Sequence, residues 1–379
     1  MRKEHIKAHT GLRGVAAAVV ALLHMHFTDI APLDIWRPFM HIVVAWYPVD
    51  VFFMLSGFVL GYAYVSDVSN PKINYKDYLV KRVARIVPLH YLTILAVGFM
   101  AMVAWHFGIP NRGYHLNEIP KQLLMVHAWP YLRGHTWNTP SWYVSVIFFA
   151  YLFLIPLLLK FVSKTRRSYL LISLSFLVLA MVWAVTMGNH TVGGWPAITR
   201  VVCQFSIGYL LYSLTTFKNP VSQVASKLVS VWLLLAILWV FSCWPLPIIG
   251  SMRIEFPLTT SGRLFQLTTS RMLFEFIFAL LILGLADNKK SLAKTILANR
   301  TFLWLGTISY SLYMIHNLIG KVIHPFVDKI PDSTWLRILI SIGLYAFVLA
   351  ASWLMYKFFE VPSRDYVTKY FSKSKISNK

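Results

Sequence analysis

The sequence predicts an all-α fold, a polytopic transmembrane helix bundle, from its composition, the length of its apolar segments and the placement of its charges. Of its 379 residues, 57% are hydrophobic and only 13% are charged, whereas a soluble domain is about 25% charged. So few charged side chains cannot cover the surface of a soluble domain, and we expect an integral membrane protein.

Ten apolar segments are long enough to cross a hydrocarbon core of ~30 Å as helices, which predicts about ten spans. The first is the weakest, because it is short and contains histidines, and the seventh runs into a break at Pro245 and Pro247. We expect residues 1–360 to form one transmembrane domain and residues 361–379 a short basic cytoplasmic tail. The segments lie near residues 14–30, 38–65, 86–107, 140–159, 168–187, 196–217, 228–249, 264–286, 301–323 and 335–357.

The basic residues lie mostly in the two tails and the even-numbered connections, which hold 25 of the 36 Lys and Arg residues. Because cytoplasmic loops carry the excess of positive charge, we expect both termini in the cytoplasm and an even number of spans. A formal net charge of +22 can also indicate nucleic-acid binding, but these charges flank apolar segments instead of forming one patch. We therefore expect no nucleic-acid partner and attribute the charge to topology and an anionic lipid bilayer.

The cysteines and the first residues of the sequence bear on whether the protein has disulfides, a metal site or a cleaved signal peptide. Cys203 and Cys243 each lie inside an apolar run, so we expect neither a disulfide framework nor a metal site. The basic first residues are followed by an apolar stretch without a small-residue cleavage site. We therefore expect the first segment to stay in the membrane and not to be removed as a signal peptide.

The first segment, GLRGVAAAVVALLHMHF from Gly11, carries two ionisable residues on one helix face. Arg13 and His24 are 11 residues apart, which is about three turns and ~16 Å along an α-helix. Arg13 would then lie at the cytoplasmic surface and His24 near the middle of the membrane, where an ionisable side chain indicates a functional site. The alternative is a histidine bonded to a neighbouring helix and an arginine that only anchors the end of its helix.

An arginine followed, after ten residues, by a histidine in the first membrane helix resembles the signature of membrane-bound acyltransferase family 3. The resemblance implies transfer of an acyl group, usually acetyl, from acyl-CoA to hydroxyl groups of cell-surface carbohydrates and some small molecules. Four further stretches resemble family motifs in the same order, so the likeness spans almost the whole chain. They are VDVFFMLSGFVL (49–60), KRVARIVPLHYL (81–92), ISYSLYMIHNLI (308–319) and EVPSRDY (360–366).

The stretch SWYVSVIFFAY (141–151) departs from the family pattern, which is Trp-Ser-Leu-Ser-x-Glu followed shortly by Phe-Tyr. Tyr143 stands in place of the first serine and Ile147 in place of the glutamate. This departure puts a role of that carboxylate in doubt and indicates a subgroup with a different acceptor. Three positions fit the pattern, namely Trp142, Ser145 and Tyr151.

Acyl transfer from a thioester requires a site for the phosphates of the acyl donor, which we expect to be acetyl-CoA. Arg82 and Arg85, at i and i+3, share a helix face at the predicted cytoplasmic entrance of the third span. Guanidinium groups suit paired hydrogen bonds to phosphate, so we expect Arg13, Arg82 and Arg85 to bind the nucleotide end of acyl-CoA. The alternative is that the arginines only fix the topology.

The transfer also requires a base for the hydroxyl proton and a donor to stabilise the oxyanion. We expect His24 to be the general base. Asp50 is a candidate for orienting a histidine or receiving a positive charge, with a membrane-border position as its alternative. His316 with Asn317 is a candidate for oxyanion or acceptor contacts, with interhelical hydrogen bonding as the alternative.

Further residues are expected around the same cavity. Trp142 and Ser145 would line its acceptor side, while Glu360 is expected to pair with an arginine. Gly57 indicates close helix packing. Residues 108–139 are rich in His, Trp, Tyr and Asn, which predicts either a sugar-binding loop or an interfacial aromatic belt.

We therefore expect a membrane O-acyltransferase, in the inner membrane of a bacterium, that acts on a glycan or another hydroxyl-bearing acceptor. The alternative is a proton-coupled transporter or flippase, because intramembrane His and Arg in a helix bundle also suit a carrier. Transporters commonly contain internal repeats, and none is visible in this sequence. A non-catalytic scaffold would leave the constellation of Arg13, His24, Arg82 and Arg85 without a reason.

Overall fold

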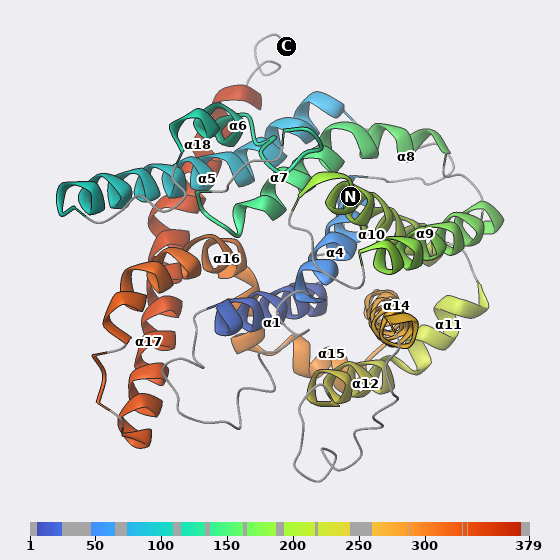
Figure 1. Ribbon diagram of the computed structural model, residues 1–379. Helices are drawn as coiled ribbons and strands as arrows, with labels where there is room; N and C mark the ends of the chain where they lie inside the picture. Colours follow the sequence, from blue (N-terminus) through green and yellow to red (C-terminus); the bar gives the residue numbers. More distant parts are fainter. Residues whose placement is uncertain are drawn as a thin grey trace.

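The computed structural model of this chain describes residues 6–24, 47–64, 74–108, 115–132, 137–161, 165–186, 193–216, 219–242, 260–287, 289–327, 329–331 and 333–372. Within these ranges the regular structure is helical, with no strand, so the all-α prediction is confirmed. Figure 1 shows the helices and their order along the chain.

Each of the ten predicted apolar segments overlaps a helix in the described ranges. The principal helices are α1 (Lys7–His24), α4 (Tyr47–Tyr64), α5 (Tyr75–His106), α7 (Ser141–Phe149) with α8 (Ile155–Phe161), α9 (Thr165–Val185), α10 (Gly194–Thr215), α12 (Val229–Ser242), α14 (Thr260–Gly284), α16 (Arg300–Val327) and α17 (Thr334–Met355). Shorter helices flank them, namely α6 (Ile119–Leu123), α11 (Pro220–Lys227), α15 (Leu292–Leu297) and α18 (Val361–Ser372).

By length and composition, five helical stretches among the described residues can cross a membrane, or six if α11 and α12, bent by 66°, form one span. The fold is therefore that of a helical membrane protein, and the count of ten spans stays a prediction. The five stretches are Tyr75–His106, Ser141–Leu159, Arg167–Val185, Gly194–Thr215 and Trp335–Phe371.

Small residues bring the central helices into close contact. A Cβ atom added to Gly14 of α1 would lie 2.4 Å from the backbone nitrogen of Gly306 in α16. One added to Gly57 of α4 would lie 2.0 Å from the carbonyl oxygen of Phe205 in α10, which confirms the close packing predicted there. Small residues at helix interfaces in membranes allow this approach of two backbones.

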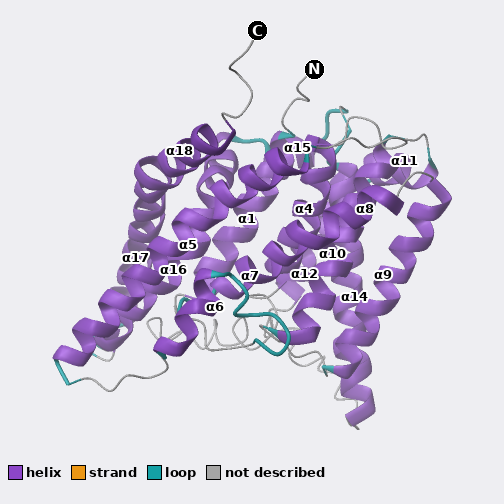
Figure 2. Cartoon of the chain, turned by 90° about the horizontal axis from the view of Figure 1, so that it is seen from above, coloured by secondary structure: helices purple, strands orange, loops and turns teal. Residues whose placement is uncertain are grey.

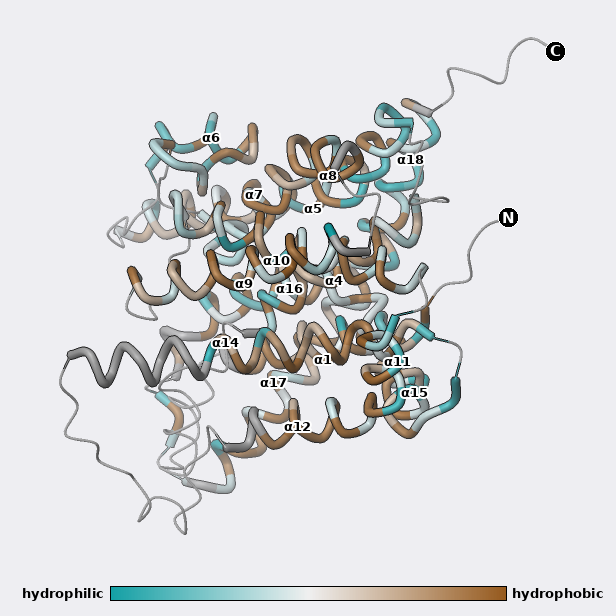
Figure 3. Tube along the Cα trace, turned by 90° about the vertical axis from the view of Figure 1, so that its right-hand side faces the viewer, coloured by the Kyte–Doolittle hydropathy of each residue, from teal (hydrophilic) through white to brown (hydrophobic). Residues whose placement is uncertain are grey.

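The two ends of the described chain lie on the same side of the bundle. Figures 2 and 3 show α15 and α18 at one end and α6 at the other. α1 begins at the α15 end, because Gly11 lies directly against the carbonyl oxygen of Leu297. This arrangement is what the predicted topology requires, and the identity of the two sides stays a prediction.

Outside the spans, Asp287 fixes the turn between α14 and α15. Its carboxylate accepts hydrogen bonds from Ser226 of α11 and Lys294 of α15. Partial burial raises the pKa of Asp287, but these hydrogen bonds and the Lys294 charge outweigh burial and leave the pKa lowered. The charged contact thereby holds α15 in place against the start of α1.

Candidate functional site

α1 carries both residues of the predicted first-helix pair, but Arg13 lies inside the helix and not ahead of it. The helix begins at Lys7, seven residues before the start that its hydropathy predicts near residue 14. His24 is its last residue, ~16 Å along the axis from Arg13. The remainder of the predicted segment, 25–30, lies outside the described residues.

His24 lies beside His316 of α16. Their ring centroids are 5.3 Å apart and the ring planes are tilted by 57°. In each ring, Nδ1 lies 2.9 Å from the carbonyl oxygen four residues earlier, that of Val20 or Leu312. A carbonyl oxygen only accepts hydrogen bonds, so each neutral ring carries its proton on Nδ1 and its lone pair on Nε2. Two of the predicted catalytic residues therefore lie together, each with a lone pair on Nε2.

Arg13, Arg85 and Glu360 form a charged group towards the start of α1. The Nη2 atom of Arg13 donates to the carbonyl oxygen of Gly306 at 2.8 Å. Both arginines interact electrostatically with Glu360, and its carboxylate also accepts a hydrogen bond of 2.6 Å from Ser311 Oγ. Glu360 is thus buried as the counter-ion of two arginines, in keeping with the pairing expected from the sequence.

Arg82 lies one turn before Arg85 in α5 and contacts different partners. Its Nη2 atom donates to the hydroxyl of Tyr64 at 3.0 Å, and its guanidinium carbon lies 5.4 Å from the Tyr64 ring centroid. Tyr151 interacts electrostatically with both Arg82 and Arg13. The three predicted donor-binding arginines therefore gather around shared neighbours at one end of the bundle.

Two π turns present residues to these arginines. One turn, Ala150–Leu154, joins α7 to α8 and carries Tyr151, while the other, Tyr356–Glu360, joins α17 to α18 and ends on Glu360. A proline stands at the second position after the end of each turn, where its missing N–H and its ring disfavour regular α-helical bonding. π turns inside α-helices are frequent at functional sites, and both turns here supply contacts of Arg13.

A buried ionic network surrounds Asp50. The Nη2 atom of Arg200 lies 2.5 Å from the Asp50 carboxylate, and both side chains are buried. Arg200 also lies 5.7 Å from the ring centroid of Trp142. Gln204 donates to Glu275 at 2.5 Å, and Glu275 interacts electrostatically with Asp50 and Arg200. Asp50 therefore receives a positive charge, which is one of the two roles expected for it.

The sequence analysis missed most of this network, although a signal for it was present. Arg200, Arg271 and Glu275 lie inside apolar segments, where charged residues are costly and usually functional or paired. Trp183 joins Arg200 and Arg271, whose guanidinium carbons lie 4.8 and 4.5 Å from its ring centroid. The pairing itself was not predictable, because Arg200 is 150 residues from Asp50 in the sequence.

Tyr143, which stands where the family has a serine, forms part of an aromatic wall next to the histidines. Its ring stacks on Phe53 with centroids 4.8 Å apart and lies 5.4 Å from Tyr313. Tyr313 lies 5.9 Å from His316. Ile147, at the position of the family glutamate, is buried in the hydrophobic core. The departure from the family pattern thus adds apolar and aromatic surface beside the site.

The remaining residues predicted to bind the acyl acceptor, Ser145 and Asn317, lie on different helices, α7 and α16. Ser145 Oγ accepts a hydrogen bond of 3.1 Å from the amide of Ala128, and its carbonyl oxygen accepts one of 3.0 Å from Trp129 Nε1. Ser145 therefore holds the His- and Trp-rich loop against α7. Asn317 is next to His316 in α16, and its Nδ2 atom is buried without a hydrogen-bond partner among the described residues.

The same loop is packed into the fold around a second pair of histidines. The rings of His90 in α5 and His127 in the loop are parallel to within 11°, with centroids 5.7 Å apart. His90 Nε2 donates to the carbonyl oxygen of Gln122 at 2.9 Å, and His127 Nε2 lies 3.1 Å from Ser141 Oγ. Both histidines are fully buried, so they hold the loop to α5 and α7.

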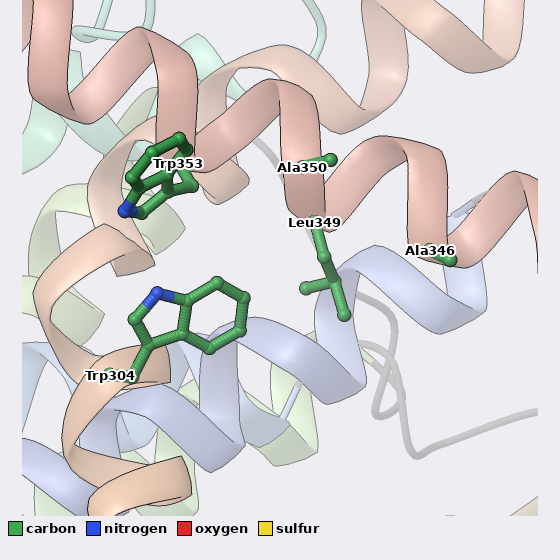
Figure 4. Close-up of a pocket in the computed structure, with 5 residues that line it drawn as sticks. All are labelled: Trp304, Ala346, Leu349, Ala350 and Trp353. Atoms are coloured by element: carbon green, nitrogen blue, oxygen red, sulfur yellow. The ribbon is translucent and has the colours of Figure 1, made fainter.

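An apolar groove of about 490 Å³ lies between α16 and α17. Figure 4 shows Trp304 on α16 facing Trp353 and Leu349 on α17. Ala346 and Ala350 complete the lining of the groove. The two indole nitrogens are therefore the only polar side-chain atoms among these five lining residues. The groove offers no group for acid–base chemistry.

The fold and the site define a helical membrane protein in which α1 carries Arg13, part of an arginine group, and His24, one of a pair of histidines. The model of the acyltransferase domain of family 3 matches residues 7–357. This chain therefore belongs to that family and is a membrane acyltransferase, as the motifs predicted.

Two curated relatives agree with this assignment. ORF330 of the Acidianus two-tailed virus, which is named as an acetyltransferase, is 25% identical over 327 residues, 85% of this chain and 86% of ORF330. Acyltransferase MdmB of Streptomyces mycarofaciens is 32% identical over 161 residues, 41% of this chain and 39% of MdmB. No solved structure matches this chain.

Proposed function

We propose that this acyltransferase moves an acyl group, in the first place acetyl, from acyl-CoA to a hydroxyl group of a cell-surface or lipid-linked glycan. The observation that carries the proposal is the arrangement along α1. Arg13 lies in a group of arginines towards one end of the helix, and His24 lies against His316 at the other end.

The arginines suit the phosphates of the donor. CoA is a polyanion, and guanidinium groups bind phosphate through paired hydrogen bonds. Arg13, Arg82 and Arg85 would hold its nucleotide end, with Glu360 setting the orientation of Arg13 and Arg85. The flexible pantetheine arm would then extend ~16 Å along α1 and bring the thioester to His24.

The histidines suit the transfer itself. His24 Nε2 would take the proton of the acceptor hydroxyl while the hydroxyl oxygen attacks the carbonyl carbon of the thioester. The lone pair of His316 Nε2 would accept a hydrogen bond from a neighbouring, non-reacting hydroxyl of the acceptor, and Asn317 Nδ2 would donate one to the oxyanion. The carbon–sulfur bond then breaks, and the CoA thiolate recovers a proton from the His24 imidazolium.

The proposal includes ten spans with both termini in the cytoplasm, in the inner membrane of a bacterium. It is supported by the excess of basic residues in the tails and the even-numbered connections. The common side of α15, α18 and the start of α1 agrees with such a topology. CoA is then bound from the cytoplasm without crossing the membrane.

The test is a transfer assay with purified protein in lipid nanodiscs and acetyl-CoA labelled in the acetyl group. We expect release of free CoA and a labelled acceptor when a lipid extract from the producing cells is supplied. A protein carrying His24→Ala should insert and bind acetyl-CoA but release CoA about 10²- to 10⁴-fold more slowly. Wild-type protein that releases no CoA under these conditions would contradict the proposed function.

A further inference from the structure

The residues just before α7 are fixed to the turn of α16 that carries His316 and Asn317. The Nδ2 atom of Asn138 donates to the carbonyl oxygen of Met314 at 2.9 Å. Lys321 donates from Nζ to the carbonyl oxygen of the preceding residue, Trp137, at 3.1 Å. Because Asn138 is also fully buried, this part of the loop belongs to the interior of the bundle.

Helical geometry places Asn138 next to the proposed reaction site. At 100° per residue, Asn317 lies about 60° around α16 from Met314 and about 100° from His316. Asn317 therefore lies between the side of α16 that contacts Asn138 and the side that carries His316 against His24. On this side of the helix, Gly320 and Tyr313, whose ring centroid lies 5.9 Å from that of His316, stand between His316 and Asn317.

Asn138, His316 and Asn317 form a polar strip along this part of α16. Three buried polar atoms of the strip have no hydrogen-bond partner among the residues that the structure describes. They are Asn138 Oδ1, Asn317 Nδ2 and His316 Nε2. The identities of Asn138 Oδ1 and His316 Nε2 are fixed by their other contacts, because the amide nitrogen of Asn138 and the Nδ1 atom of His316 both face carbonyl oxygens. The strip thus presents two hydrogen-bond acceptors and one donor. Buried polar groups left unpaired are unfavourable, and a ligand with several hydroxyl groups would satisfy all three.

We propose that Asn138 binds the acceptor and makes the enzyme specific for polyhydroxylated acceptors over simple alcohols. Its Oδ1 atom accepts a hydrogen bond from a second hydroxyl of the acceptor while the reacting hydroxyl lies against His24. The inference rests on the proposed acyl transfer and adds the acceptor class and a residue that selects it. A loop that is buried in the fold thereby contributes directly to substrate choice.

The test compares two acceptors that share a chain and differ in hydroxyl number, octyl β-glucoside below its micelle concentration and 1-octanol. Wild-type protein in nanodiscs should acetylate octyl glucoside in preference to octanol. Asn138→Ala should raise the KM for octyl glucoside about 5- to 10-fold, the effect of one hydrogen bond. The KM values for octanol and acetyl-CoA should stay at wild-type values, since neither uses Oδ1.

Three variants separate binding from loop anchoring. Lys321→Ala loosens the loop without touching the Asn138 amide, and Thr139→Ala alters an exposed neighbour, so neither should change the ratio of the two acceptor KM values. Asn138→Asp keeps the Oδ1 acceptor but loses the Nδ2 donor, so it should retain the preference for octyl glucoside. This variant decides the question if Asn138→Ala fails to fold.

The remaining outcomes distinguish a failure of the role of Asn138 from a failure of the proposed function. Equal effects of Asn138→Ala on both acceptors, no effect on octyl glucoside, or no transfer to octyl glucoside by an active wild type would overturn the role of Asn138. Release of no CoA by the wild type with any acceptor would instead contradict the proposed function, so the two failures are distinguishable.

Discussion

The two histidines differ in their surroundings and not in their tautomer. Both carry a proton on Nδ1, which lies 2.9 Å from a carbonyl oxygen in each case. His316 is fully buried, whereas His24 is only partly buried at the end of α1. A general base must exchange its proton with the reactants in every cycle, so His24 is the better placed of the two.

We predict that His24→Ala lowers kcat by about 10²- to 10⁴-fold, the usual contribution of a general base. His316→Ala should lower kcat less and raise the KM for the acceptor, because it removes a hydrogen bond from a neighbouring, non-reacting hydroxyl of the acceptor. Steady-state kinetics of both variants with varied acceptor would check this. An inactive His316→Ala together with an active His24→Ala would assign the base to His316 instead.

The arginines are tested by substitutions that keep their charge. Lysine cannot make the planar pair of bonds that a guanidinium makes, so Arg82→Lys and Arg85→Lys should raise the KM for acetyl-CoA about tenfold and lower kcat less. Arg337→Lys, in α17 near its start, is the matched control and should change neither constant. A wild-type KM in both variants would leave Arg82 and Arg85 as topology anchors.

Among the elements, apolar length predicted where helices form but not how they begin or bend. α1 starts at Lys7 because His9 is buried and lies 2.8 Å from the carbonyl oxygen of Ile282, a contact that local hydropathy does not contain. The first π turn, Ala150–Leu154, is as apolar as the α-helices that it joins, so composition could not distinguish it. Only the proline after each turn was a visible sign of irregular bonding.

The pairing of the elements was predictable in part. Gly57 indicated close packing without naming α10 as its partner, and Arg13 and His24 were correctly placed on one helix. The contact of His24 with His316 and that of Asn138 with Met314 join residues that are far apart in the chain. One sequence, with its local patterns, does not specify such long-range contacts.

The contact of α1 with α16 is tested by one glycine. Gly306→Ala would place a Cβ atom 2.1 Å from the carbonyl oxygen of Thr10, so α1 must move and the protein should lose about 1–3 kcal/mol of stability. Activity should fall with it, because Arg13 and His24 move too. Gly343→Ala in α17 meets no atom within 4 Å and should melt like the wild type. Equal melting temperatures of the two variants would contradict the close contact.

Across the whole molecule, the polar groups are distributed from one side of the bundle to the other. The arginine group lies towards the side of α15 and α18, the histidine pair lies at the far end of α1, and Asn138 belongs to the loop that includes α6. In the proposed topology, donor and acceptor would therefore approach from opposite sides of the membrane.

The sidedness is tested by labelling single cysteines in a variant without Cys203 and Cys243. A cysteine at Ser291, which caps the start of α15, should resist an impermeant thiol reagent in intact spheroplasts. One at Asn111, outside the described residues, should react, because its loop faces away from the cytoplasm in the proposed topology. The reverse pattern would place the arginines on the side that acyl-CoA does not reach.

The central claim is that the arginine group binds acetyl-CoA and that His24 carries out the transfer. It is tested most directly by measuring acetyl-CoA binding and CoA release in the same nanodisc samples of His24→Ala and Arg85→Ala. We predict that His24→Ala binds acetyl-CoA like the wild type but releases CoA about 10²- to 10⁴-fold more slowly. Arg85→Ala should bind weakly and still release CoA at saturating acetyl-CoA. Release of CoA by His24→Ala at the wild-type rate would contradict the assignment of the reaction to this end of α1.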